Sequence, residues 1–221
     1  MQLLHTFIDT VLHLDRTLRD VVQQHGTGTY GILFLIVFCE TGLVVTPFLP
    51  GDSLLFAAGA VAAVGPLSAG WLIVVLLAAA LAGDNVNYWV GRFLGRRLLG
   101  LRKGRLVRRE HLERTHAFYE KYGAKTIVIA RFVPIVRTLA PFVAGLGRMS
   151  YRRFIGFSVA GGAFWVCAGV LSGYLFGNVP FVQKNFSLVI LAIVALSLLP
   201  AVVELVRVRR TRTAVPPDGA P

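Results

Sequence analysis

Cysteine is scarce in this chain of 221 residues, and both examples, Cys39 and Cys167, lie in apolar segments. Two such cysteines do not make a disulfide framework, so we interpret them as small core residues. The five histidines lie outside the long apolar segments, and neither a His/Cys metal spacing nor a Gly-x-Ser-x-Gly motif is present. Hydrolysis of a phosphate ester calls for a histidine or a metal beside the site. We therefore expect no enzymatic activity, no metal and no cofactor.

Charged residues are also few, and the acidic ones are the rarer kind. They make up 15% of the chain against 55% hydrophobic residues, with 23 Lys and Arg, 11 Asp and Glu and a formal net charge of +12. Because soluble domains are about one quarter charged, this composition predicts an integral membrane protein with one membrane domain. The N-terminus lacks a basic start followed by an apolar run, so we expect no cleavable signal peptide.

The positive charge is concentrated in residues 91–125 and in the tail from Arg207. In a soluble protein such patches would suggest nucleic acid, but no groove-reading motif accompanies them, and we expect no nucleic-acid partner. Next to membrane spans they predict cytoplasmic segments that contact anionic lipid headgroups. The C-terminus is therefore expected in the cytoplasm.

The fold class predicted from these patterns is an all-α integral membrane protein. Residues 1–27 carry apolar and charged faces at helical spacing and predict an N-terminal amphipathic helix at the membrane interface. The membrane domain is expected over 28–206, followed by a disordered basic tail at 207–221. Its remaining predicted elements are full transmembrane helices at 71–90, 154–176 and 186–206, and a basic cytoplasmic loop at 91–122.

Two further apolar stretches are interrupted by proline and predict re-entrant hairpins at 30–64 and 123–147. Each half of these stretches is shorter than the about 20 residues that a membrane span needs. The helix breaks are assigned to Pro47, Pro50, Gly51 and Pro134. Irregular backbone of this kind is tolerated at membrane depth only where it is buried in protein or lines a cavity.

The two hairpins show a short internal similarity. Phe48-Leu49-Pro50 followed by Ala58-Gly59 corresponds to Phe132-Val133-Pro134 followed by Ala144-Gly145. The charge distribution places the second hairpin on the cytoplasmic side, which puts the first hairpin and the N-terminal helix on the outer side. An inverted repeat of broken helices is typical of secondary transporters, whose site lies near the bilayer midplane.

Four charged residues lie inside these apolar hairpins: Glu40, Asp52, Arg131 and Arg137. Each charge at bilayer depth costs about 2.5–3.5 kcal/mol unless it pairs or meets water. The break at Pro134 lets both guanidiniums turn into one cavity, where their planar forks suit phosphate oxygens. In a low dielectric the two carboxyl groups could carry a proton or a cation. The alternative interpretation is a set of structural salt bridges that pin the hairpins together.

Other polar and small residues leave alternatives open. Asp84 and Asn87 belong either to a solvated end of the 71–90 span or to the site itself. A repeat of glycine at every fourth position from 169 to 177 predicts close helix packing, within the subunit or between subunits of a homo-oligomer. Trp165 is interpreted as a packing or aromatic-belt residue.

With these residues placed, the chain resembles the DedA family of membrane proteins, also called VTT-domain or SNARE-associated-like proteins. The resemblance covers about residues 28–180. The motifs that carry it are Glu40-x6-Pro47-x2-Pro50-Gly51-Asp52, Phe118-Tyr119-x3-Gly123, Arg131-Phe132-x-Pro134-x2-Arg137, Ala144-Gly145-x3-Met149-x4-Phe154 and Gly162-x2-Trp165.

The resemblance implies a bacterial inner-membrane protein of several spans with two opposed re-entrant hairpins. Members of the family are implicated in flipping undecaprenyl phosphate or phosphatidylethanolamine, and eukaryotic relatives scramble phospholipids. The family's essential acids correspond to Glu40 and Asp52, to which proton coupling is attributed, and its essential arginines correspond to Arg131 and Arg137.

The favoured expectation is a transporter that binds a phosphate headgroup, best matched by undecaprenyl phosphate, and moves it across the inner membrane with protons. The alternatives are a phosphatidylethanolamine scramblase, an exchanger of protons against Na⁺ or K⁺, and an assembly or scaffold protein.

Overall fold

The computed structural model describes residues 14–42, 51–100, 127, 128, 131, 134–186, 188–193 and 195. This part of the chain is helical apart from short turns and contains no strand, which confirms the all-helical class there. Its elements are α2 (Leu14–His25), the 3₁₀ turn η1 (Gly26–Gly28), α3 (Thr29–Gly42), α4 (Gly51–Val64), α5 (Ala69–Gly100), α8 (Pro134–Leu146), α9 (Tyr151–Phe176) and α10 (Pro180–Lys184).

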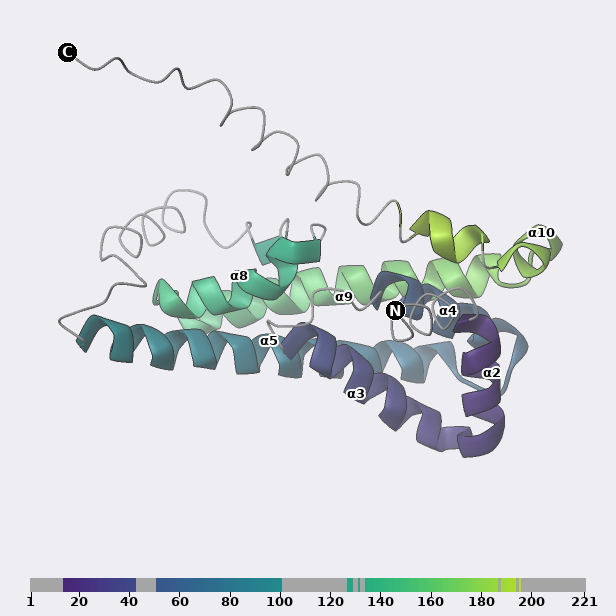
Figure 1. The fold of residues 1–221 in the computed structure, drawn as a ribbon, viewed down its shortest axis with the longest axis horizontal. Helices are drawn as coiled ribbons and strands as arrows, with labels where there is room; N and C mark the ends of the chain where they lie inside the picture. The colour runs from purple at the N-terminus through teal and green to yellow at the C-terminus, as the bar shows by residue number, and fades with distance from the viewer. Residues whose placement is uncertain are drawn as a thin grey trace, which may run out of the picture.

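Two long helices, α5 and α9, run along the long axis of the molecule (Figure 1). Among the described residues, Ala69–Leu94 and Tyr151–Phe176 are the segments long and apolar enough to cross a membrane. They correspond to the predicted spans at 71–90 and 154–176. The third predicted span, 186–206, is helical over 188–193, and most of its remainder lies outside the described residues.

The helices α3 and α4 contain 14 residues each. A helix of that length rises about 21 Å, against a hydrocarbon core about 30 Å thick. Residues 53–62 of α4 are all buried, as expected for a helix that is apolar on every side. The predicted breaks at Pro47 and Pro50 lie outside the described residues, so the first re-entrant hairpin stays a prediction.

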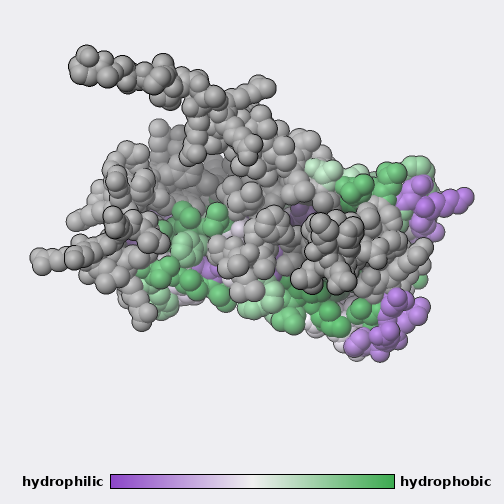
Figure 2. Space-filling view, in the orientation of Figure 1, coloured by the Kyte–Doolittle hydropathy of each residue, from purple (hydrophilic) through white to green (hydrophobic). Residues whose placement is uncertain are grey.

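The described surface is apolar along the flank and polar at one end (Figure 2). The polar end carries exposed Gln23, Gln24 and His25 at the close of α2, and exposed Gln183 and Lys184 of α10. Large apolar side chains face outward from the two long helices instead of packing inside. Examples are Trp71, Val74, Trp89 and Phe93 on α5, and Phe164, Leu171, Leu175 and Phe176 on α9. Helices of this kind fit a lipid environment.

Glycine lets the helices approach until backbone touches backbone. A Cβ atom at Gly173 of α9 would lie 2.8 Å from the Phe56 carbonyl carbon of α4, and one at Gly59 would lie 2.9 Å from the Val170 carbonyl carbon. Neither position has room for a side chain. Gly169 and Gly177 also face α4, against Leu55 and Ala60. The glycine repeat therefore packs within the chain, which was one of its two predicted roles; the other was packing between subunits.

The same reciprocal contact joins α5 to α8. A Cβ atom at Gly145 would lie 2.9 Å from the Tyr88 carbonyl carbon, and one at Gly91 would lie 2.9 Å from the Phe142 carbonyl carbon. In both helix pairs each glycine faces a carbonyl three residues before the partner glycine. The Ala58-Gly59 and Ala144-Gly145 similarity thus marks equivalent packing positions, one in α4 and one in α8.

One helix end differs from the sequence-based expectation. Helix α5 continues to Gly100, past the predicted start of the basic loop at 91, because its Arg and Leu residues are good helix formers and no proline interrupts them. Helix α8 begins at Pro134, the predicted helix break, since proline lacks the N–H that is unpaired at the first helical position anyway.

Helix α2 ends before Gly26, whose φ of 52° favours glycine. Residues 1–13 of the predicted N-terminal helix lie outside the described residues.

Candidate functional site

Arg137 is the centre of a buried ionic cluster formed by three helices. Its Nη1 donates to Asp52 Oδ1 at 2.9 Å, and its Nη2 pairs with Glu40 Oε1. Arg137 is the fourth residue of α8, Asp52 the second of α4, and Glu40 lies near the end of α3. A cation so near a helix N-terminus is disfavoured by the helix dipole, so the two carboxylates are needed to hold it there.

Solvent access differs sharply within this cluster. The Glu40 side chain is 1% exposed and that of Arg137 is 8% exposed, whereas the Asp52 side chain is 28% exposed. Burial disfavours the ionised form of Glu40, while the neighbouring guanidinium favours it. Glu40 Oε2 and Arg137 Nε are buried without a hydrogen-bond partner among the described groups. The centre of the cluster therefore holds one acceptor oxygen and one N–H donor that make no hydrogen bond to the described groups.

Gly51 allows Glu40 to reach the start of α4. Its backbone N–H donates to Glu40 Oε1 at 3.2 Å, so the carboxylate caps a helix N-terminus as well as pairing with Arg137. A Cβ atom at Gly51 would lie 2.5 Å from the Glu40 carboxyl carbon. Glycine at this position is therefore required for the contact, in addition to the helix-breaking role predicted for it.

Trp165 of α9 connects this cluster to the second arginine. Its indole Nε1–H donates to Asp52 Oδ1 at 2.7 Å, and its ring centroid lies 5.1 Å from Arg137 Cζ. The Arg131 Cζ atom lies 5.9 Å from the same centroid. The side chain is 7% exposed, so the aromatic-belt interpretation of Trp165 is wrong and its position is interior.

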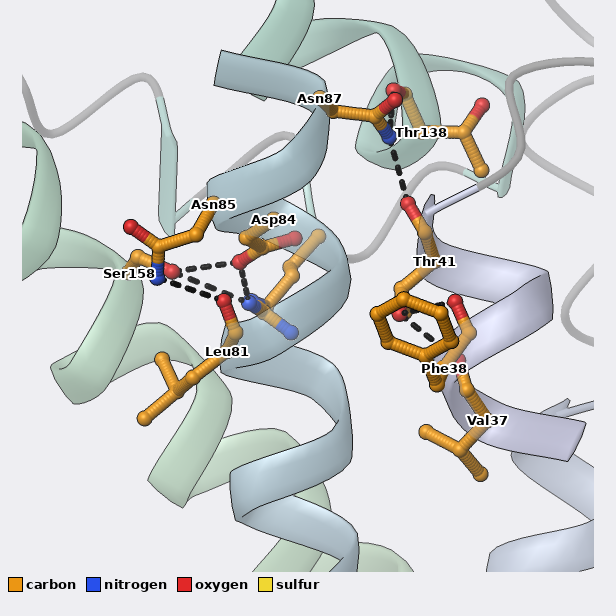
Figure 3. A network of polar contacts seen from close by, with 10 residues as sticks. Val37, Phe38, Thr41, Leu81, Asp84, Asn85, Asn87, Thr138 and Ser158 are labelled. Carbon is orange, nitrogen blue, oxygen red and sulfur yellow. Dashed lines mark hydrogen bonds and ion pairs between the residues drawn. The ribbon is translucent and has the colours of Figure 1, made fainter. Parts of the chain in front are cut away.

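Arg131 forms a second, separate ion pair. It lies in the turn before α8, where its backbone N–H donates to the Val128 carbonyl at 3.2 Å. Its guanidinium pairs with Asp84 of α5, and the Ser158 hydroxyl of α9 donates to the same carboxylate oxygen. Figure 3 shows Asp84 and Ser158 facing each other between α5 and α9. All three side chains are buried.

Two glycines of α9 make room for the Arg131 side chain. A Cβ atom at Gly161 would lie 3.4 Å from Arg131 Cδ, and one at Gly162 would lie 3.5 Å from Arg131 Cζ. Together with Ser158 and Trp165, these glycines occupy positions i, i+3, i+4 and i+7 on one helical face. The Arg131 side chain therefore packs against this face of α9.

Asn87 joins three helices through backbone carbonyls. Its Nδ2 donates to the Thr41 carbonyl of α3 at 2.6 Å and lies 3.4 Å from the Thr138 carbonyl of α8, as Figure 3 shows. The Thr41 hydroxyl in turn donates to the Val37 carbonyl at 2.7 Å. Asn87 therefore supports the helices that carry Glu40 and Arg137 through their backbone carbonyls.

The predicted residues are brought together in part. Glu40, Asp52 and Arg137 meet, whereas Arg131 pairs with Asp84 and not with the two predicted acids. The solvated-end interpretation of Asp84 is wrong, because the side chain is buried well inside α5. Of the predicted helix breaks, Gly51 and Pro134 are the first residues of α4 and α8.

The sequence reasoning missed Ser158 and the contacts of Trp165. A signal for both was present, since a serine and two glycines precede Trp165 at helical spacing within an otherwise apolar segment. A stripe of small and polar residues on an apolar helix indicates a face that receives another backbone or a polar side chain. The tryptophan at its end is therefore a contact residue of that face.

Comparisons with known proteins agree on one family. The VTT domain model matches residues 49–175. Protein DedA of Escherichia coli is 51% identical over 95% of this chain and 97% of that protein. The uncharacterized membrane protein Rv0364 of Mycobacterium tuberculosis is 46% identical over 86% of this chain and 85% of its own, and the E. coli inner membrane protein YqjA is 38% identical over 70% of each chain. No solved structure matches. The chain is therefore a membrane protein of the DedA family and carries a VTT domain.

Proposed function

We propose that this protein transports a lipid with a phosphate headgroup across the inner membrane and couples the movement to protons. The observation that carries the proposal is the pair of buried guanidiniums, Arg131 and Arg137, held within reach of one indole ring. Planar guanidinium forks suit phosphate oxygens, and buried arginine inside a membrane is expensive unless it has a functional or structural partner. The favoured substrate is a polyprenyl monophosphate, such as undecaprenyl phosphate.

The charge balance of the cluster supports proton coupling. Glu40, Asp52 and Asp84 face two arginines, so the five residues sum to one negative charge when all are ionised. A phosphate monoester brings up to two more negative charges. In a low dielectric that excess is unfavourable, and protonation of the carboxyl groups removes it. Proton uptake would thus release Arg137 from its carboxylates at the moment when the substrate needs it.

The arrangement in the membrane is part of the proposal. The short helices α3 and α4 would form one re-entrant hairpin, and the segment leading into α8 would form the other from the opposite leaflet. The starts of α4 and α8 would then meet near the midplane, where Asp52 pairs with Arg137. The basic loop and the C-terminus would face the cytoplasm.

The test is headgroup flipping in proteoliposomes that contain a polyprenyl monophosphate and, in parallel, labelled phosphatidylethanolamine. A phosphatase added outside reports the phosphate that reaches the outer leaflet. Arg137→Lys keeps the charge but loses the fork, so we expect at least about tenfold slower flipping. Arg153→Lys, at an exposed position of α9, is the matched control and should leave the rate unchanged. Unchanged flipping in Arg137→Lys would count against direct phosphate binding.

A second candidate is an exchanger of protons against Na⁺ or K⁺. The excess of one carboxylate over the two guanidiniums favours it, because a bound cation would neutralise the cluster. It predicts ion flux in liposomes that contain no phosphorylated lipid. If ion flux occurs only when a phosphorylated lipid is present, the exchanger is excluded and transport of a phosphate headgroup remains the proposed function.

A further inference from the structure

Trp165 makes three contacts that a packing residue does not need. Its ring lies against both guanidiniums, at 5.1 Å from Arg137 Cζ and 5.9 Å from Arg131 Cζ. Its Nε1–H donates to Asp52 Oδ1 at 2.7 Å. Cations within about 6 Å of an aromatic centroid are attracted by the ring quadrupole, and tryptophan is the strongest partner. One side chain thus contacts both arginines and one acid.

The position of the indole is fixed from several sides. Its hydrogen bond to Asp52 attaches one edge to the start of α4, and its backbone belongs to α9, which packs on α4 through glycine contacts. The face of α9 that continues from Trp165 through Gly162 and Gly161 holds the Arg131 side chain. The ring therefore contacts two cations, Arg137 of α8 and Arg131 of the turn before it, that pair with different carboxylates.

The ion pairs alone would not hold the two arginines together. Arg137 is held by carboxylates of α3 and α4, and Arg131 by the carboxylate of α5. If a phosphate or a proton displaces these acids, the ring remains the shared contact of both guanidiniums. An aromatic face attracts a cation without neutralising it, so both arginines keep their full charge for an anion.

We propose that Trp165 is a positioning residue for an anionic headgroup, because its indole ring holds Arg131 and Arg137 together while leaving their charges available to one phosphate group. The inference rests on the proposed function. It acts through the arginines and does not require Trp165 to touch the phosphate. A packing role alone would predict that variants change stability and leave phosphate affinity unaltered.

The first test uses the indole as its own reporter. The chain contains three tryptophans, and Trp71 and Trp89 are exposed, so Trp71→Phe with Trp89→Phe leaves a protein whose emission comes from Trp165 alone. Decyl phosphate is titrated into this protein in neutral detergent, and decyl maltoside is the control amphiphile. We expect a saturable change in Trp165 emission with decyl phosphate, absent in the same protein carrying Arg137→Gln.

The second test compares two replacements in the otherwise unaltered chain. Trp165→Leu removes the ring, and we expect about tenfold weaker binding of decyl phosphate by calorimetry, in line with a desolvated cation–π contact. Trp165→Phe keeps an aromatic face and loses the N–H donor, so it should recover most of the affinity. Trp71→Leu, at a tryptophan that is 65% exposed on α5, is the matched control and should bind like the unaltered protein.

The outcomes separate this inference from the proposed function. If the unaltered protein neither binds decyl phosphate nor flips the lipid, the proposed function fails and the inference fails with it. If it does both, but folded Trp165→Leu binds and flips equally well, the inference alone is overturned. Should Trp165→Leu not fold, the emission experiment decides: binding by calorimetry without any emission change would overturn the positioning role.

Discussion

Asp84 and Arg131 form the ion pair whose removal should have the largest effect on stability. The two side chains are 5% and 6% exposed, and the Ser158 hydroxyl donates to the same carboxylate. Asp84→Asn keeps the size of the side chain and removes its charge. Arg131 would then be a buried cation with no carboxylate partner among its described contacts, while Ser158 would keep an oxygen acceptor.

The expected loss is about 3–5 kcal/mol in the free energy of unfolding, the usual result of breaking one side of a buried pair. Asp52→Asn is the matched comparison with the same chemical change. The Asp52 side chain is 28% exposed, and Arg137 keeps Glu40 as a partner. Its loss should therefore be about 1 kcal/mol or less.

A combined apolar replacement separates structure from function at the same pair. Asp84→Leu with Arg131→Met and Ser158→Ala removes every charged and polar group together, so no group is left buried and unpaired. Such replacements are neutral or stabilise by about 1–4 kcal/mol. We expect this variant to unfold near the unaltered protein and yet to flip no phosphorylated lipid, because the proposed site has lost one guanidinium.

The assay is equilibrium unfolding in mixed micelles with increasing SDS, followed by circular dichroism, together with flipping in proteoliposomes. Loss of less than about 1 kcal/mol in Asp84→Asn would mean that the pair is solvated or unformed, against the burial seen here. Flipping at the normal rate by the combined variant would show that Arg131 serves structure alone.

Three further predictions concern the scaffold around the charges. Gly173→Ala should lower the free energy of unfolding by about 1–3 kcal/mol, because its Cβ atom meets the α4 backbone. Gly156→Ala, in open space on the same helix, is the control and should be neutral or stabilise by up to about 1 kcal/mol. Equal effects of the two variants in SDS unfolding would contradict the close approach of α9 to α4. Tyr88→Phe removes a hydroxyl that donates to the Met149 carbonyl at 2.6 Å and should cost about 1–3 kcal/mol by the same measurement, a result that an unchanged midpoint would refute. Asn87→Ala leaves a buried carbonyl at the end of α3 unpaired and should also cost about 1–3 kcal/mol, and it should slow flipping; a stable, fully active variant would refute its supporting role.

Much of the scaffold followed from local chemistry. Apolar runs of sufficient length predicted α5 and α9, and short runs bounded by Pro and Gly predicted the beginnings of α4 and α8 within a few residues. The glycine repeat of α9 predicted close packing, because small residues on one face admit a neighbouring backbone. These features depend on periodicity and chain conformation, which the sequence displays directly.

The pairing of the charges did not follow from the sequence. Arg131 and Arg137 lie six positions apart and seemed suited to the two acids of the first hairpin, yet Arg131 pairs with Asp84. Which carboxylate an arginine reaches depends on the rotation and depth of three packed helices, and this is set by contacts such as those of Gly161 and Gly162. Sequence spacing carries no information on that rotation between separate helices.

The carbonyl-to-glycine contacts join four of the described helices into two pairs, α4 with α9 and α5 with α8. Where two backbones are in direct contact, no side chain between them can rearrange, so we expect each helix pair to move as a single body. Asp52 and Trp165 would travel with the first body, and Asp84, Arg131 and Arg137 with the second. Asp52 and Arg137 would therefore form the first ion pair between the bodies to open, while Arg131 keeps Asp84 and the Trp165 ring keeps its contact with both arginines.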